Sequence, residues 1–211
     1  RGGRPAAPDL AEGAEEDDRG GGSAAVGRCR FCGCRLCSAG DHEGLCANLE
    51  RHGLLAPGGA LARAFRAVDR ADFVPPPPDG GEDLAYVDAA VYLDFGAQIS
   101  APHVHAHALG VLFPPEVERE RHGMPLRVLD VGCGSGFAAA VLARLAEALR
   151  PECKESGVLA VEHIAELTER ARQNIGRNHG SLLAGGRLEL QCMDGRQLCR
   201  ERPDLQGCFH A

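Results

Sequence analysis

The sequence is poor in large aromatic side chains and carries no excess of basic residues. It has no Trp, 2 Tyr and 7 Phe among 211 residues, so its core must be built from Leu, Val, Ala and Ile. Asp and Glu outnumber Lys and Arg by 30 to 23, which gives a formal net charge of −7. The negative charge and the small number of aromatic side chains that could stack on bases do not indicate nucleic acid as a partner.

Long apolar runs are also missing. No stretch of about 18 apolar residues occurs, so the sequence predicts no transmembrane helix and no membrane partner. The first residue is Arg1 rather than Met, and no apolar signal-peptide core follows it, so we expect a piece of a longer reading frame. Without a signal peptide, the 10 Cys are expected to be free thiols in a reducing compartment, which predicts a cytoplasmic protein.

The first 40 residues differ in composition from the rest. Residues 1–27 contain mainly Gly, Ala and acidic residues, and they cannot bury enough apolar surface to order themselves. The run CRFCGCRLC at 29–37 has two Cys-x2-Cys pairs separated by one residue, unlike the spacing of about 15–20 residues in a zinc ribbon. We therefore predict a disordered, Cys-rich extension over 1–40 without a metal, with a zinc knuckle as the alternative, and one domain over 41–211.

The first half of that domain is expected to be helical. Asp41 is a candidate N-cap for one helix, a second helix follows Pro57 and ends before the prolines at 75–78, and residues 79–99 form a loop with a short extended piece. Ser100 is a candidate N-cap for a third helix that reaches Leu112, and 114–125 is a surface connection. The first helix is expected to contain Leu45, Leu49 and His52, and the second has Leu61, Phe65 and Val68 on one face.

The second half alternates between strands and helices. Apolar strands are expected at 126–131, 158–161 and 187–192, with helices between them, the second over 164–177. This βαβαβ order predicts an α/β fold with a doubly wound, Rossmann-like parallel sheet. A fourth strand is expected to begin at 207–211, where the sequence stops, so the sheet is interpreted as C-terminally truncated.

The turn after the first of these strands reads LDVGCGSG at 129–136. Its glycines Gly132, Gly134 and Gly136 follow a strand and open a helix, where backbone approaches a nucleotide-like ligand closely, although a tight turn without a ligand has the same spacing. Asp130 precedes the first glycine. It would repel a pyrophosphate, but it suits a ligand with an ammonium group and no phosphate, such as S-adenosylmethionine.

Acidic residues also end the next two strands. Glu162 is placed to accept hydrogen bonds from ribose hydroxyls, although a helix cap is an equal alternative, and Asp194 could meet an adenine amine. Together with Asp130 they would lie along the carboxyl edge of the sheet, where open α/β sheets bind ligands.

Several segments carry a family resemblance. They are QISAPHVHAHAL (98–109), AVDRADFVP (67–75), AYVDAAV (85–91), RVLDVGCGSG (127–136), VEHIAEL (161–167) and MDGR (193–196). Through them, residues 42–211 resemble the protein-L-isoaspartate (D-aspartate) O-methyltransferase family. By this comparison the last residues, 208–211, look like the start of the family's fourth strand, and its C-terminal quarter is missing.

The resemblance implies S-adenosylmethionine as methyl donor and the free carboxylate of an isoaspartyl or D-aspartyl residue of an age-damaged protein as acceptor, with the enzyme as a monomer. It implies that Ser100 is the catalytic residue. The implied donor-binding residues are Ala97, Gln98, Ile99, Ser100, His105, Asp130, Gly132, Gly134, Glu162, His163, Asp194 and Gly195. A different S-adenosylmethionine methyltransferase, or an inactive donor-binding fragment, is the alternative.

Some features depart from the family or suggest other chemistry. Gln98 stands where Thr is usual, Asp94 where Gly is expected, and the 114–125 connection is longer than usual. Asp94-Phe95-Gly96 matches a kinase triplet, but no other kinase motif accompanies it. His103 and His107 are expected to share a helix face while His105 points away, which disfavours a shared metal site.

Overall fold

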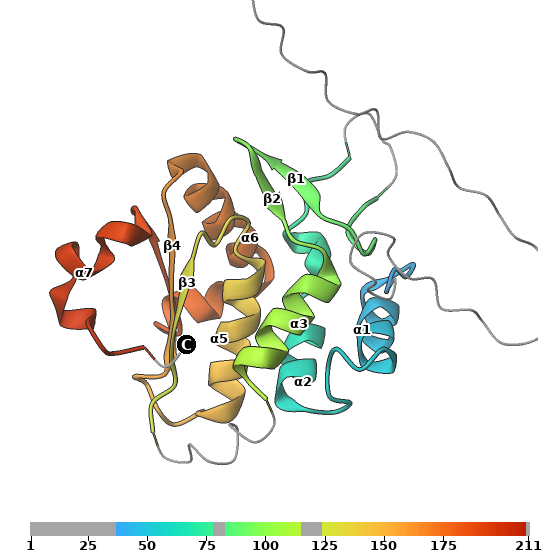
Figure 1. The fold of residues 1–211 in the computed structure, drawn as a ribbon, viewed down its shortest axis with the longest axis horizontal. Coiled ribbons are helices and arrows are strands. Elements are labelled where there is room, and N and C mark those ends of the chain that lie inside the picture. The colour runs from blue at the N-terminus through green and yellow to red at the C-terminus, as the bar shows by residue number, and fades with distance from the viewer. Residues whose placement is uncertain (1–36, 78–82, 115–123, 210–211) are drawn as a thin grey trace, which may run out of the picture.

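The computed structural model describes residues 37–77, 83–114 and 124–209. Figure 1 shows a parallel sheet on one side of helix α5 (Phe137–Leu149) and the N-terminal helices on its other side. A hairpin of two short strands lies above these helices. Helix α5 therefore joins the two halves that the sequence predicted separately.

The N-terminal helices are short. Helix α1 (His42–Arg51) begins after Asp41, whose carboxylate accepts a hydrogen bond from the Gly44 backbone N–H at 2.7 Å, which confirms the predicted cap. Helix α2 (Ala60–Arg66) ends before the buried Val68, and the 3-10 turn η1 (Arg70–Asp72) follows.

A hairpin then leads into the third helix. Strands β1 (Val91–Asp94) and β2 (Ala97–Ile99) pair antiparallel, where the sequence indicated only a short extended piece. Helix α3 (Pro102–Leu112) has Ala101 at its N-cap, with no side-chain cap hydrogen bond, so the prediction that Ser100 caps it is wrong. Ser100 instead lies between the end of β2 and the N-cap residue Ala101.

The second half confirms the predicted alternation. Strands β3 (Arg127–Val131), β4 (Gly157–Glu162) and β5 (Leu188–Cys192) form a parallel sheet in the order β3-β4-β5. Helix α6 (Ala165–Ala184) runs past the predicted end at 177, with non-helical backbone at His179. The remaining elements are η3 (Gly195–Gln197), α7 (Leu198–Glu201) and η4 (Pro203–Leu205).

The predicted fourth strand is wrong as far as the structure describes it. Residues 207–209 form a turn and irregular backbone, and 210–211 lie outside the described residues. The last segment instead places Leu198 on the sheet face formed by Leu159 and Val161, with Leu205 and Phe209 packed against that cluster. Among the helices that can be described, none combines the length and the apolar character needed to cross a bilayer.

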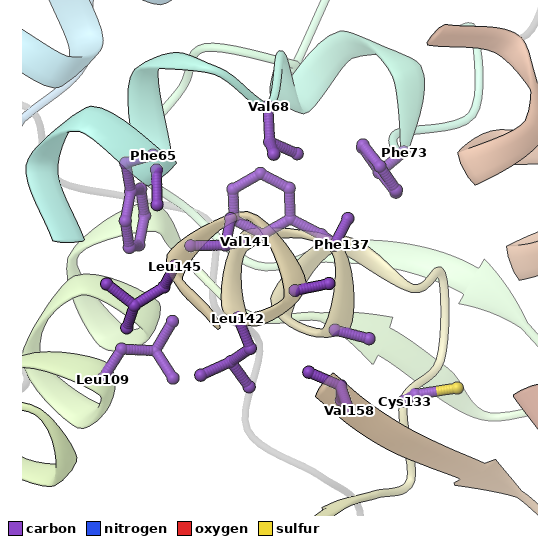
Figure 2. Close-up of a cluster of buried hydrophobic side chains, with 14 of the residues drawn as sticks. Phe65, Val68, Phe73, Leu109, Cys133, Phe137, Val141, Leu142, Leu145 and Val158 are labelled. Carbon is purple, nitrogen blue, oxygen red and sulfur yellow. The ribbon is translucent and has the colours of Figure 1, made fainter. Parts of the chain in front are cut away.

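The main core gathers around Phe137 at the start of α5. Figure 2 shows its ring among Phe65, Val68 and Phe73. Phe65 and Phe73 meet Phe137 edge-on, with ring centroids 5.9 and 5.5 Å apart. Because Phe137 directly follows the glycine turn, the packing of the core also fixes the position of that turn.

The packed part of the chain already includes residues 37–40, which the sequence assigned to the extension. The Cys37 side chain is fully buried, and its backbone N–H donates to the Asp88 carboxylate at 2.9 Å. The Ala39 N–H donates to the Tyr86 carbonyl at 3.1 Å. The predicted zinc alternative falls largely on 29–36, which lie outside the described residues.

Candidate functional site

A cavity of about 250 Å³ opens at the carboxyl end of β3, between the glycine turn, the end of β2 and helix α3. Predicted site residues from both halves of the chain line it. They are Gln98, Ile99, Ser100, His105, Asp130, Gly132 and Gly134. Apolar side chains also contribute to the wall, among them Leu109, Leu112, Phe137 and Leu142. Leu109 lies in the 98–109 motif and Leu142 on the apolar helix face that the sequence predicted.

The glycine turn needs its glycines for two different reasons. Gly132, Gly134 and Gly136 all have positive φ, at 80°, 53° and 87°, which disfavours other residues. At Gly136 a Cβ atom would also lie 3.0 Å from Ile175 and 3.2 Å from Ala171, so α6 packs against the turn. A Cβ atom at Gly132 would meet nothing within 4 Å, so space for a ligand remains over the backbone there.

Glu162, at the end of β4, braces this turn. Its side chain is only 5% exposed, and one carboxylate oxygen accepts from the Gly134 N–H at 3.1 Å. The other oxygen accepts from the N–H groups of His163 and Ile164 at 2.8 and 3.1 Å. Glu162 does not line the cavity in this structure, but a carboxylate has about four lone-pair sites, so it can accept further hydrogen bonds.

Asp130 is the polar group at the base of the cavity. One of its carboxylate oxygens is buried and has no hydrogen-bond partner among the described residues. Burial, with a smaller contribution from the charge of Glu162, raises the pKa of Asp130 to about 6. A buried, unpartnered carboxylate oxygen is well suited to a ligand that brings a positive charge and N–H donors.

The hairpin that delivers Ser100 has a turn with unusual backbone angles. Asp94, Phe95 and Gly96 have φ of 75°, 53° and 75°, so the kinase-like triplet is a tight hairpin turn. A Gly at position 94, as the family resemblance implies, would adopt this conformation without strain. The Asp94 carboxylate is paired with Arg170 of α6 at 2.9 Å and does not line the cavity.

Arg170 makes a second contact that fixes the hairpin. Its other terminal nitrogen donates to the Leu93 carbonyl at 2.5 Å. The guanidinium thus holds both a carboxylate and a backbone oxygen at the end of β1, the strand that pairs with β2 and so with the segment before Ser100.

The remaining predicted residues lie outside the cavity wall: Ala97, His163, Asp194 and Gly195. The Arg196 guanidinium, through hydrogen bonds, lowers the pKa of Asp194 to about 2. At Gly195 a Cβ atom would lie 2.5 Å from Val131, so η3 packs directly on the end of β3. Asp194 is thereby held beside that strand end, although it does not reach the cavity itself.

The three histidines of α3 have different surroundings. His103 donates its backbone N–H to Asp88 at 3.0 Å, and its ring Nδ1 lies 2.8 Å from the same carboxylate. His105 points into the cavity wall, and His107 lines a separate hollow beside residues 53–62. His103 and His107 therefore have no common environment, although helix spacing places them on one face.

Comparisons with known proteins identify the family to which the chain is similar. The family model for protein-L-isoaspartate(D-aspartate) O-methyltransferase matches residues 40–203. Protein-L-isoaspartate O-methyltransferase 1 of Arabidopsis thaliana is 35% identical over 162 residues, 76% of this chain and 62% of the relative. The Caenorhabditis elegans enzyme is 33% identical over 135 residues, 64% of this chain and 51% of the relative. The chain thus spans between half and two thirds of the length of these relatives.

A solved structure shows the same fold. It is a crystal structure from Plasmodium falciparum, described as a protein-L-isoaspartate O-methyltransferase in complex with S-adenosyl-L-homocysteine. The match has a TM-score of 0.62 and 28% sequence identity, and it covers 79% of this chain and 69% of that one. With the family match extending over most of the sequence, these findings show that the chain belongs to the protein-L-isoaspartate (D-aspartate) O-methyltransferase family.

Proposed function

We propose that this chain binds S-adenosylmethionine and transfers its methyl group to the free carboxylate of isoaspartyl or D-aspartyl residues in damaged proteins. One observation carries the proposal besides family membership. The unpartnered Asp130 oxygen and Ser100, the residue that matches the family's active-site serine, line one cavity. When bound, the donor supplies a methyl group already activated on a positively charged sulfur.

On the donor side, Asp130 would accept from the ammonium group. Glu162 would hold the ribose hydroxyls with its spare lone pairs, and Asp194 would meet the adenine amine. Gly132 leaves open space at the backbone, which suits close approach of the ligand. The residues Ala97, Gln98, Ile99, His163 and Gly195 complete the proposed donor site.

On the acceptor side, the chemistry needs alignment more than a strong base. A carboxylate is already ionised near neutral pH, so it can attack a methyl group directly once it is held in line. Ser100 would donate its O–H to the acceptor carboxylate. The hydroxyl is available for this because it does not cap α3.

We further propose a cytoplasmic monomer that acts on protein substrates and not on nucleic acid or membranes. The negative net charge and the free cysteines of the described residues support this view. Gel filtration with light scattering tests the monomer, and fractionation of cells tests the compartment.

The experiment that tests the function compares two peptides of identical sequence, one with an isoaspartyl and one with an ordinary aspartyl residue. Transfer of labelled methyl groups from S-adenosylmethionine to the isoaspartyl peptide alone is the expected result. Equal transfer to both peptides would contradict the repair function. Donor binding without transfer to either would identify the chain as a donor-binding fragment.

A further inference from the structure

Asp88 is a buried carboxylate that does not line the cavity. One of its oxygens accepts from the Cys37 backbone N–H at 2.9 Å, and the other accepts from the His103 backbone N–H at 3.0 Å. The ring Nδ1 of His103 lies 2.8 Å from that second oxygen. The backbone N–H of Asp88 itself donates to the Ser38 hydroxyl at 2.9 Å. These bonds hold the carboxylate in one place, because a buried charge is costly unless donors surround it.

Asp88 supplies the cap that α3 lacks. The first backbone N–H groups of a helix have no partner within the helix, and the N-cap residue Ala101 has no side chain that could accept from them. Pro102 carries no N–H, and the Val104 N–H donates to the Ala101 carbonyl at 3.0 Å. The His103 N–H lies between these two positions and donates to Asp88. A carboxylate at this end of a helix is also favoured by the helix dipole.

The chain between this cap and Ser100 has little freedom. Proline fixes its own φ and confines the residue before it to extended backbone. Ala101 accordingly has φ of −58° and ψ of 147°, and Pro102 follows it as the first residue of α3. Few torsions are therefore free between Ser100 and His103. A hydrogen bond that fixes the His103 N–H also restricts the backbone at Ser100.

The segment that carries Asp88 also holds the chain on the other side of Ser100. Strand β1 begins at Val91, three residues after Asp88, and Val91 pairs with Ile99, the residue directly before Ser100. Figure 1 shows this hairpin leading directly into α3. Residues 88–91 thus fix Ser100 from both directions, by strand pairing before it and by the cap after it.

The charge of Asp88 is compensated by a buried cation. The Arg70 side chain is fully buried, and one of its terminal nitrogens donates to the Ala89 carbonyl at 3.4 Å. Burial lowers the pKa of Arg70 to about 10, against the opposite effect of the Asp88 charge, so the guanidinium stays charged near neutral pH. Neither residue lines the cavity, so neither is placed to contact a substrate there.

We propose that Asp88 is a positioning residue for methyl transfer: its buried carboxylate caps helix α3 from outside the helix and thereby holds Ser100 where its hydroxyl meets the acceptor carboxylate. The inference rests on the proposed function. It also assigns a role to the acidic residue of the 85–91 motif, for which the sequence alone indicated none.

The first test compares Asp88→Ala in the full chain with a variant that loses a similar bond elsewhere. In Ser156→Ala, the buried Leu126 N–H loses its bond of 2.9 Å to the Ser156 hydroxyl, at the opposite end of the sheet from the cavity. Both variants should lower the thermal midpoint. Only Asp88→Ala should also lower kcat, by about tenfold, at saturating donor and isoaspartyl peptide, because a misplaced group loses its alignment. Asp88→Asn keeps one acceptor oxygen and should recover part of the turnover.

The second test asks whether Asp88 acts through Ser100. In a double-mutant cycle, Asp88→Ala combined with Ser100→Ala should have the kcat of Ser100→Ala alone within about twofold, because there is no hydroxyl left to position. Two independent residues would give the product of the two losses instead. Asp88→Asn replaces Asp88→Ala in this cycle if the alanine variant does not fold.

Three results would overturn the inference. One is an Asp88→Ala variant that keeps its kcat when folded, which would make Asp88 a structural residue only. Another is an equal loss of kcat in Ser156→Ala, and the third is a double variant that shows the full product of both losses. A wild type that methylates neither peptide would contradict the proposed function instead. Amide hydrogen exchange would then decide whether Asp88 caps α3: exchange at His103 should be faster in Asp88→Ala, and an unchanged rate would reject the cap.

Discussion

The two sides of the cavity are built in different ways. On the sheet side, parallel strands and backbone hydrogen bonds place Asp130 and the glycine turn, and Gly132 donates to the Val161 carbonyl at 2.8 Å. On the hairpin side, side chains from distant parts of the sequence hold the backbone. Arg170 reaches back to the β1 end, and Asp88 joins residues 37–38 to α3. We infer that changes to the glycine turn on the sheet side mainly affect folding, that changes to Asp130 affect donor binding, and that changes to Ser100 on the hairpin side mainly affect methyl transfer.

Gly136→Ala should cause the largest loss of stability. A Cβ atom would require left-handed backbone at φ of 87° and would crowd Ile175 and Ala171 of α6. Strain and overpacking together predict a loss of about 2–4 kcal/mol in the free energy of unfolding. Urea denaturation measures it.

Gly176→Ala in α6 is the matched control. A Cβ atom there meets nothing within 4 Å, so this change should stabilise the protein by about 0.5–1 kcal/mol through helix propensity. If both substitutions had the same effect, the packing of α6 on the glycine turn would not determine stability.

Ser100→Ala tests the hairpin side. We expect unchanged donor affinity and thermal midpoint, because Ser100 caps no helix, and a loss of turnover on an isoaspartyl peptide. A positioning hydrogen bond to a charged group contributes about 1.5–3 kcal/mol, so turnover should fall roughly ten- to a hundredfold. Steady-state methyl transfer measures it.

Ser100→Thr keeps the hydroxyl and should retain more activity than Ser100→Ala. Wild-type turnover in the alanine variant would remove Ser100 from the mechanism. If the same preparation lost activity on changing His105, the orienting hydrogen bond would come from that ring instead.

The same contrast explains what the sequence could predict. Apolar runs predict the strands and their order along the chain, and the spacing of the glycines predicts the turn. Both are local signals in the sequence. The hairpin was missed because its short strands depend on Arg170, 76 residues away from Asp94. Helical backbone resumes after the kink at His179 and continues to Ala184, beyond the predicted end at 177, and Leu182 of this last part is buried.

The strand pattern alone predicted the site residues at strand ends, whereas Ser100 and His105 were predicted only through the family resemblance. Asp130 and Glu162 lie where parallel strands finish, and the charge of Glu162 acts on Asp130. The hydrogen-bond partners of the strand-end acids were not predictable from the sequence. Arg196 donates to Asp194, and the Gly134 N–H donates to Glu162, only because of the local backbone geometry. The burial of Arg70 was not predictable, because it arises only when η1 packs against α6 and the Phe137 ring.

Two truncations should separate the packed N-terminal residues from the extension. Removing residues 1–36 is expected to leave the midpoint nearly unchanged, because that segment has few large apolar residues. Removing residues 1–40 also deletes the buried Cys37 and its hydrogen bond to Asp88, and should cost about 1–3 kcal/mol. Thermal denaturation compares the two. Equal midpoints would show that Cys37 contributes nothing to stability.

Asp130 should control donor affinity in a way that depends on pH. Burial raises its pKa to about 6, so the carboxyl is largely neutral at pH 5 and ionised at pH 7. An ammonium ligand needs the ionised form, and donor affinity should therefore increase about tenfold between these pH values. Calorimetry at pH 5, 6 and 7 measures it. In Asp130→Asn, affinity at pH 7 should fall by ~1–3 kcal/mol and lose this pH dependence.

Stability should change in the opposite direction. Because the folded-state pKa of Asp130 lies above the ordinary value of 3.8, the unfolded state releases the proton first. The free energy of unfolding should therefore decrease as pH rises from about 4 to 6 and then level off, and Asp130→Asn should remove this decrease. Denaturant titrations of both proteins across that range test the sign. Two results together would contradict this role of Asp130: a donor affinity that does not change with pH, and a free energy of unfolding that Asp130→Asn leaves unchanged. The ammonium group of the donor would then bind elsewhere, and Asp130 would supply no charge to the cavity.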